Sequence, residues 1–244
     1  MKGLFLIDLE TVPADLPFRA GRIDIPARVP APDPPASMRR AETIAKWRAE
    51  RGNAKHRDAY LRESLSPYRC RIAAAAILCA DGSGQTIRIA HRDGESAGVM
   101  LGRIATALRE ERAQAIAHWG GFDRGVLRGQ LASAGTSEDS RRYLRWLLDV
   151  SSHQGRPWYL RCADVSVWST ARMHDRSGWS LAEVASALGL GAKTGVASDA
   201  VASAWVHGDA AGIANRAAED VRLTAQICAA DGILGPLADW YSRI

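Results

Sequence analysis

Two carboxylates, Asp8 and Glu10, stand two residues apart at the end of an apolar stretch near the start of the chain. Residues 3–7 suit a buried strand, and no turn residue follows until Pro13. Side chains at i and i+2 point to the same face of a strand, so the two acids converge on one spot. Two anions held this close repel each other unless a cation lies between them. The pair predicts half of a Mg²⁺ or Mn²⁺ site, and the alternative is a strand that ends in a polar turn.

A third acid, Asp123, comes directly after a short apolar strand pattern and a Gly-Gly loop. A helical pattern over residues 122–134 begins at this point, so Asp123 lies in the first turn of a helix. In open α/β sheets, functional sites form at such junctions between a strand and a helix. Taken alone, the acid is also explained by its favourable interaction with the helix dipole.

A fourth acid, Asp220, lies in the middle of a long helix that is predicted from Asp209 to Cys228. A lone acid in a helix is most simply a surface residue. Asp220 is embedded in the largely apolar stretch 217–221, however, and this context argues against full exposure.

In their order and surroundings the four acids resemble the DEDD superfamily of 3′–5′ exonucleases, which have a ribonuclease-H-like fold. The branch that fits best is the predicted exonucleases related to the proofreading domain of family B DNA polymerases. The resemblance covers roughly residues 3–13 and 70–228. Four motifs carry it: Asp8-Leu-Glu-Thr-Val-Pro13, Phe122-Asp123 after His-Trp-Gly-Gly, Ser180-Leu-Ala-Glu-Val-Ala-Ser-Ala-Leu-Gly-Leu190, and Asp220-Val-Arg-Leu-Thr224.

The resemblance implies a metal-dependent 3′–5′ exonuclease that hydrolyses phosphodiester bonds and releases 5′-monophosphates. It implies nucleic acid as substrate, single-stranded DNA rather than RNA, and replication or repair proteins as partners without indicating which. Backbone around Leu9 and Thr11 would face the terminal nucleotide. Two divalent ions, Mg²⁺ or Mn²⁺, suit carboxylate ligands that hold a phosphate between them. The residues implied as both catalytic groups and metal ligands are Asp8, Glu10, Asp123 and Asp220.

The chain departs from the family at the general base, a His or Tyr five or four residues before the last acid. Those positions are Asn215 and Arg216 here, and neither accepts a proton at neutral pH. Without a base the rate falls typically by about 10²–10⁴, while the metal ligands remain. His118 and His207 are candidate bases, each equally explained as an ordinary surface or loop histidine. Trp119 replaces a frequent Asn, and either stacks on a base or packs against the sheet.

Two other functions stay open. Because the base is missing, the chain is alternatively a catalytically weakened nucleic-acid-binding module of the same fold. The sequence Asp8-Leu-Glu10-Thr-Val is also one residue away from the Asp-x-Asp nucleophile motif of haloacid-dehalogenase-type phosphatases. That chemistry uses Asp rather than the longer Glu as its second acid, which makes the phosphatase the weakest of the three hypotheses.

Strand and helix patterns alternate around the acids, which predicts an α/β fold in a single domain over residues 1–244. By resemblance, this fold is a ribonuclease-H-like mixed sheet flanked by helices. Residues 70–79 and 86–90 are predicted to form an antiparallel hairpin, and 113–117 a short strand. Helices are predicted at 97–111, 122–134, 199–206, 209–228 and 233–243. Ser180 and Glu183 have capping-box spacing, so a further helix begins there and stops at Gly189.

Residues 137–176 have a mostly helical pattern with a loop predicted at 155–157. A separate loop is predicted at 191–195. Four aromatic residues of the segment 137–176 are predicted to belong to the core: Trp146, Trp158, Tyr159 and Trp168.

Residues 14–66 are predicted to be an insertion between the first two strands. The part 14–36 holds most of the chain's ten prolines and must be extended. The part 37–64 has a helical pattern with eight Lys and Arg residues against four Asp and Glu residues. Such a charge excess indicates either a solvated helix face or a basic arm that holds a phosphate backbone beside the active site.

Composition sets wider limits. The chain has 244 residues, 47% of them apolar, and a formal net charge of +5. Its isoelectric point near 9.3 mildly favours a polyanionic partner. Neither an apolar run of about 18 residues nor a signal-peptide pattern is present, which predicts no membrane partner and a cytoplasmic protein. The four cysteines lack CxxC spacing and are predicted to be free thiols.

Overall fold

The computed structural model describes residues 3–80, 82–148, 161–169, 180–190 and 198–242. The predicted core residues Trp158 and Tyr159, and the loops predicted at 155–157 and 191–195, lie outside these ranges.

The described residues form a mixed sheet of five strands in the order β3-β2-β1-β4-β5. The central strand β1 (Leu4–Pro13) pairs antiparallel with β2 (Cys70–Cys79) and parallel with β4 (Ala115–His118). Strand β3 (Ile87–Ala90) is antiparallel to β2, which confirms the predicted hairpin. Strand β5 (Cys162–Asp164) is parallel to β4. Strands β1, β4 and β5 run in one direction, so their carboxyl ends point toward the same end of the sheet.

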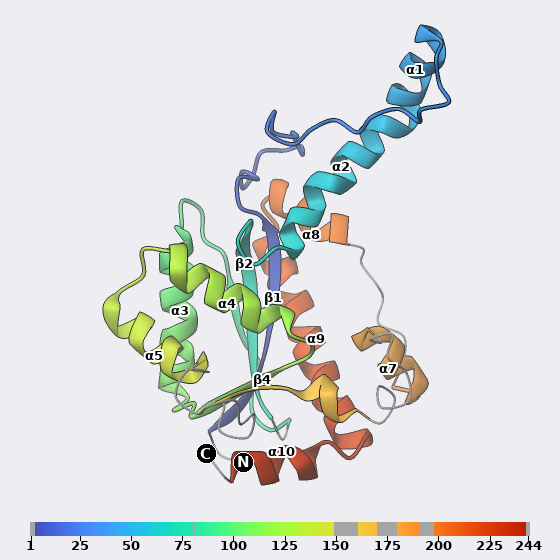
Figure 1. Cartoon of the computed structure of the whole chain (residues 1–244). Coiled ribbons are helices and arrows are strands. Elements are labelled where there is room, and N and C mark those ends of the chain that lie inside the picture. Colours follow the sequence, from blue (N-terminus) through green and yellow to red (C-terminus); the bar gives the residue numbers. More distant parts are fainter. Residues whose placement is uncertain (1–2, 81, 149–160, 170–179, 191–197, 243–244) are drawn as a thin grey trace, which may run out of the picture.

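Helices cover both faces of the sheet, which confirms the predicted α/β architecture (Figure 1). Alternate residues of β1 contribute to different layers: Phe5 and Ile7 to one, Leu4 and Leu6 to the other. The first layer contains α3 (Ala97–Glu110), α4 (Phe122–Ser133) and α5 (Glu138–Leu148). The second contains α7 (Leu181–Ala187), α9 (Ala210–Ala230) and α10 (Leu234–Tyr241). The strand pattern with period two therefore fixes which helices flank which face.

The predicted helix boundaries hold where a polar cap is present. The Ser180 hydroxyl accepts a hydrogen bond from the Glu183 N–H, and the Glu183 carboxylate accepts one from the Ser180 N–H, so the capping box is confirmed. Gly189 follows α7 with a φ of +69°, a conformation that favours glycine. Asp209 caps α9 by accepting from the Gly212 N–H. Helix α8 (Ser198–Val206) lies near its predicted place.

The prediction for residues 137–176 is partly wrong. Residues 162–164 form β5, and a 3₁₀ turn, η4 (Val165–Trp168), follows it. A three-residue strand is too short to show a period of two, and only its pairing with β4 reveals it. Trp168 packs against the second layer as predicted. Trp146 is instead 40% exposed and stacks on Tyr143, because amphipathic α5 turns it toward solvent.

The insertion after β1 forms a helical arm, residues 41–65, that extends away from the sheet (Figure 1). The arm consists of α1 (Ala41–Trp47), a π-helical turn η1 (Arg48–Gly52), α2 (Asn53–Leu61) and a 3₁₀ turn η2 (Arg62–Leu65). It begins at residue 41 rather than 37 because the backbone of Arg40 is still extended. Val29 of the Pro-rich segment is buried in one cluster with Tyr60 and Leu61 of the arm.

All four cysteines are free thiols, as predicted, and Cys70, Cys162 and Cys228 are buried. Among the helices that the structure describes, none combines the length and the apolar character that a membrane span requires.

Candidate active site at the carboxyl end of the central strand

The structure brings Asp8, Glu10 and Asp220 together. One carboxylate oxygen from each lies within 4.8 Å of the others. Asp8 and Glu10 share the β1 face on which Leu4 and Leu6 pack against the layer of α9, and Asp220 comes from α9 itself. Asp220 is buried, as its apolar context in the sequence indicates.

An irregularity in β1 lies beside these acids. The pairing of β1 with β2 shifts register between Glu10 and Thr11. Such bulges re-aim side chains and are frequent next to active sites. After the shift, the Thr11 hydroxyl donates a hydrogen bond of 2.7 Å to the carbonyl oxygen of Ser64 at the base of the arm. The strand is therefore tied to the arm directly after its second acid.

Asp123 lines the same cavity, although it does not belong to the compact group of three. Its side chain is buried at the start of α4, and it accepts a hydrogen bond from the Leu9 N–H. Burial raises the pKa of this carboxyl well above its ordinary value, and the negative charges of Glu10 and Asp220 raise it further. Positive charge placed nearby would favour the ionised form of this carboxyl.

Asp164, a residue that was not predicted from the sequence, stabilises the loop that precedes Asp123. Oδ1 of Asp164 accepts hydrogen bonds from the Gly120 N–H at 2.8 Å and from the Ser166 N–H at 3.0 Å. Gly120 has a φ of +76°, which allows the chain to turn between β4 and α4. The signal in the sequence was Asp164-Val-Ser166, the spacing of an acid that bonds the backbone two residues onward.

Arg216 holds Glu10. Its Nε donates a hydrogen bond of 2.6 Å to Oε1 of Glu10, and the two side chains are 20% and 13% exposed. Arg216 precedes Asp220 by four residues, so both occupy one face of α9 and line the cavity. Asn215 is exposed on another face. In the family that the sequence resembles, one of these two positions carries the general base. In this chain Arg216 lines the cavity there and brings a positive charge instead of a base.

The other predicted site residues divide into two groups. Leu9, Thr11 and Trp119 line the cavity, which has a volume of about 260 Å³. Trp119 also packs against the second layer, so both interpretations of this residue fit its position.

His118 and His207 are not among the residues that line the cavity. His118 is buried at the end of β4 with its Nδ1 against the carbonyl oxygen of Gly120, and burial lowers its pKa. His207 is exposed after α8, with its Nδ1 2.8 Å from the carbonyl oxygen of Ser203.

Comparison of the chain with protein-family models finds no match, and no curated protein matches it significantly. What the chain does must therefore be inferred from the site itself and from the sequence motifs.

Proposed function

We propose that this protein is a metal-dependent 3′–5′ exonuclease with a ribonuclease-H-like fold, acting on single-stranded DNA. The observation that carries the proposal is the meeting of Asp8, Glu10 and Asp220 within 4.8 Å, with Asp123 on the same cavity. These four acids come from β1, α4 and α9, far apart in the sequence. The mixed sheet with β1 at its centre is compatible with the fold. The polarity and the preference for DNA rest on the sequence resemblance.

The donor set fits a hard divalent cation. Three carboxylates offer the oxygen ligands that Mg²⁺ and Mn²⁺ prefer, and Asp8, Glu10 and Asp220 would hold the ion. Asp123 is the remaining acid for a second ion. Oε1 of Glu10 accepts a hydrogen bond from Arg216, so the guanidinium would share this carboxylate with a bound ion. Ions in such a site supply an activated water and neutralise charge that develops on the phosphate.

The chain's own residues have separate roles in this reaction. The guanidinium of Arg216 can donate hydrogen bonds to the oxygens of a bound phosphate. Trp119 offers a face for stacking by the terminal base. In the reaction the oxygen of water bonds to phosphorus and gives up a proton to solvent, and the bond from phosphorus to the 3′ oxygen of the preceding nucleotide breaks. That oxygen takes a proton from solvent, and a nucleoside 5′-monophosphate leaves.

A second candidate is a nucleic-acid-binding module of the same fold with weak turnover. The observation that favours it is the absence of a base at Asn215 and Arg216. Arg216 occupies the cavity without being able to accept a proton. Such a protein would hold a phosphate through Arg216 and release product slowly or not at all.

Labelled oligonucleotides distinguish these candidates. The purified protein is incubated with single-stranded DNA that carries a label at the 5′ or the 3′ end, with Mg²⁺, Mn²⁺ or a chelator. The exonuclease gives a descending ladder from the 5′ label and a labelled mononucleotide from the 3′ label, only with metal. Asp8→Asn is the inactive control. Tight, salt-sensitive binding without shortening in either metal would select the binding module instead.

A further inference from the structure

The helical arm carries a surface of exposed basic side chains. Every Lys and Arg between residues 39 and 62 is exposed to solvent. Of the four acids between residues 37 and 64, Glu63 is buried and Glu50 lies 3.9 Å from Lys46. The basic residues of the arm and its approach are Arg39, Arg40, Lys46, Arg48, Arg51, Lys55, Arg57 and Arg62.

Several of these charges lie along the helical part of the arm. Lys55 and Arg62 are separated by seven residues, which places them on one face of α2, and Arg48 and Arg51 lie in the π-helical turn that precedes α2. Within the described ranges, Arg48, Arg51 and Arg62 form no ion pair. At about 1.5 Å per residue, the arm is roughly 35 Å long. The eight Lys and Arg side chains of the arm and its approach are all exposed to solvent.

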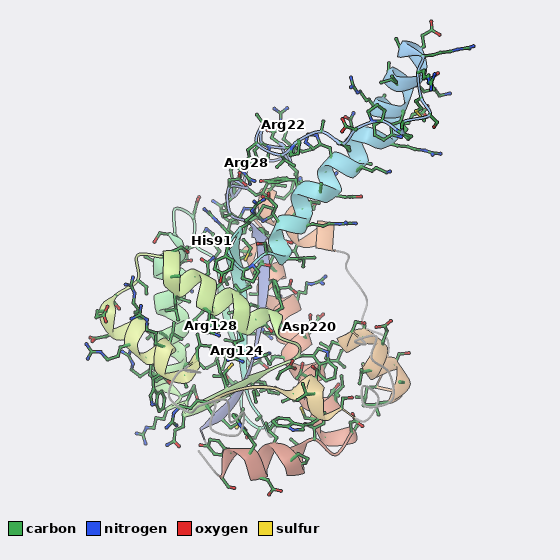
Figure 2. All side chains as sticks on the ribbon, in the orientation of Figure 1. Arg22, Arg28, His91, Arg124, Arg128 and Asp220 are labelled. Carbon is green, nitrogen blue, oxygen red and sulfur yellow. The ribbon has the colours of Figure 1, made fainter. Side chains whose placement is uncertain are left out.

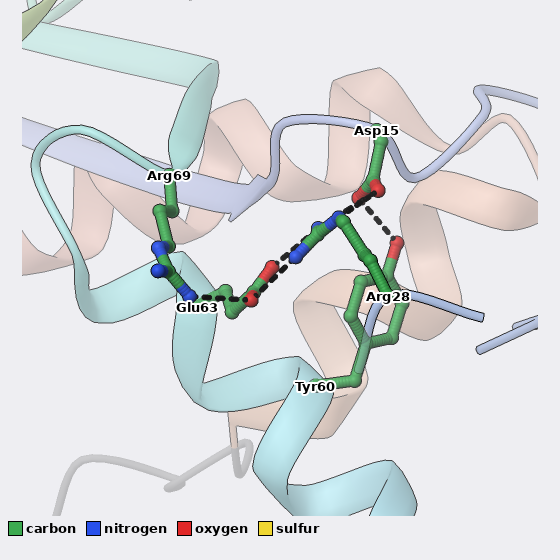
Figure 3. Close-up of polar contacts among 5 residues, drawn as sticks. All are labelled: Asp15, Arg28, Tyr60, Glu63 and Arg69. Atoms are coloured by element: carbon green, nitrogen blue, oxygen red, sulfur yellow. Dashed lines mark hydrogen bonds and ion pairs between the residues drawn. The ribbon is translucent and has the colours of Figure 1, made fainter. Parts of the chain in front are cut away.

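The arm is fixed to the body by a network of five side chains (Figure 3). Arg28, from the Pro-rich segment, donates to both carboxylate oxygens of Glu63 at 2.7 and 2.6 Å and to Asp15 at 2.8 Å. The hydroxyl of buried Tyr60 donates to Asp15 at 2.9 Å, and Arg69 donates to Glu63 at 3.2 Å. The network joins the segments before and after the arm, so the arm's direction is defined relative to the sheet.

The base of the arm reaches the candidate active site. Ser64 and Leu65 line the cavity together with Asp8, Glu10 and Asp220. Leu65 is 60% exposed, and Tyr68 beyond it is 81% exposed. Leu65 therefore offers an apolar surface at the cavity, and Tyr68, three residues further along the chain, is an exposed aromatic side chain. They resemble the aromatic and apolar contacts on which the bases of a single strand stack.

We propose that the arm of residues 41–65 binds the phosphate backbone of a single nucleic-acid strand whose end occupies the cavity. The inference rests on the proposed function, because the cavity must accept one end of the strand. Charge complementarity and continuity with the cavity select this partner. The acids at the site favour a cation, whereas the arm favours the phosphates further along the strand. The arm therefore contributes affinity for long substrates and leaves the reaction at the terminal nucleotide unchanged.

The test uses substrates of two lengths and two variants that remove the same number of positive charges. The arm variant is Arg48→Gln/Arg51→Gln/Arg62→Gln, which leaves Lys55 and its contact with the Trp47 ring intact. The control variant is Arg88→Gln/Arg142→Gln/Arg145→Gln, which removes three exposed charges from β3 and α5. Each protein binds an oligonucleotide of about 30 nucleotides at several salt concentrations, and each phosphate that is no longer neutralised lowers the salt slope by about 0.7. Cleavage of the same strand and of a trinucleotide is then compared.

The arm variant should bind the long strand at least about tenfold more weakly and lower its salt slope by about 2. Its KM for the long strand should rise while kcat, and the cleavage of the trinucleotide, stay the same. Equal weakening in both variants, or unchanged binding in the arm variant, would overturn the inference. Competition by polyglutamate as strong as that by DNA would also overturn it and indicate an acidic protein partner.

Failure of the proposed function gives a different pattern. If no protein shortens either substrate but the arm variant alone shows weaker binding and a lower salt slope, the arm inference stands and the exonuclease proposal fails. Melting temperatures of all three proteins verify that the surface substitutions leave the fold intact. If the arm variant melts earlier, the single variant Arg62→Gln should still lower the salt slope by about 0.7, and an unchanged slope would overturn the inference.

Discussion

Two clusters in this protein combine carboxylates with arginine, and they differ in charge balance. In the network at the base of the arm, Asp15 and Glu63 share Arg28, and Arg69 adds a second cation. Hydrogen bonds from Arg28 lower the pKa of Glu63. The pKa of Asp15 is also lowered, because its bonds with Arg28 and Tyr60 outweigh the opposing effect of burial. Each negative charge in this cluster has a positive neighbour.

In the cavity, by contrast, four acids face Arg216 as the one cation among the described lining residues. Burial and the neighbouring acids raise the pKa of Asp123 instead of lowering it. Figure 2 shows Asp220 on the sheet body, well below Arg28 at the base of the arm. Each acid of the network contacts a described arginine, whereas the four cavity acids share one among the described lining residues, as the proposed cation site would require. Removing an acid from the cavity should therefore abolish activity without destabilising the metal-free protein. Removing an acid from the network should destabilise the protein without reducing activity.

The largest expected effect is that of Asp220→Asn. It removes one of three carboxylates from the compact group, so we expect no detectable metal-dependent cleavage. We also expect loss of the stabilisation that metal gives, which is about 2.7 kcal/mol when the ion is at 100 times its Kd. In chelator the variant should melt at or above the temperature of the parent, because a repelling charge is gone. Assays of cleavage and melting with and without Mg²⁺ check both parts. Metal-induced stabilisation equal to that of the parent would contradict the site.

Arg216→Gln should have the next largest effect. The change removes the 2.6 Å hydrogen bond between Arg216 and Glu10, and it removes a cation from the cavity. We expect Mn²⁺ to bind about tenfold more tightly, which is about 1.4 kcal/mol. Calorimetric titration without nucleic acid measures the affinity and the number of ions bound.

Arg28→Gln is the matched control for Arg216→Gln, because it breaks an arginine–glutamate pair whose two side chains do not line the cavity. It should leave Mn²⁺ binding unchanged. If both variants shift the affinity equally, or if Arg216→Gln does not shift it, then Arg216 does not compete with metal for Glu10.

The positions of the cavity acids were largely predictable from the sequence. The spacing of Asp8 and Glu10 gave their shared face, because a strand has a period of two residues. The apolar neighbours of Asp220 indicated its burial. The meeting of strand and helix ends predicted the place of Asp123. Each of these features depends on residues close together in the sequence, so it can be recognised before the tertiary structure is known.

Contacts between distant segments were not readable. Nothing near Arg216 in the sequence indicates that it bonds Glu10, 206 positions earlier. The network of Arg28 and Glu63 joins two parts of an insertion whose course depends on packing against Tyr60. Asp164 lies in a strand of three residues, too short for a pattern. Contacts between residues far apart in the sequence depend on tertiary packing. The spacing of residues along the chain does not predict them.

Asp123→Asn should stabilise the protein when no metal is present. The folded state raises the pKa of Asp123, so folding holds the proton more tightly than the unfolded chain does. The stability of the parent therefore falls as pH rises from the ordinary Asp value through the raised pKa. The variant lacks this titration, so its advantage in free energy of unfolding should grow with pH and then level off. An advantage of about 1 kcal/mol is typical of a single stabilising substitution.

Urea unfolding in chelator at several pH values measures the advantage of Asp123→Asn. Asp58→Asn, which makes the same substitution at an exposed position on the arm, is the control. A constant difference between Asp123→Asn and the parent across the whole range would show that Asp123 does not carry the raised pKa.

Glu63→Gln should give the smallest effect and the opposite sign. Arg28 lowers the pKa of Glu63, so its contribution to stability is present above the ordinary Glu value and disappears as pH falls through the lowered pKa. Because the Arg28 side chain is 46% exposed, we expect a loss of only about 1 kcal/mol at neutral pH. Urea unfolding of variant and parent should converge in acid, while trinucleotide cleavage stays at the level of the parent. A loss of cleavage like that of Asp220→Asn would mean that the arm's network and the cavity are one functional unit, and the distinction drawn from their charge balance would fail.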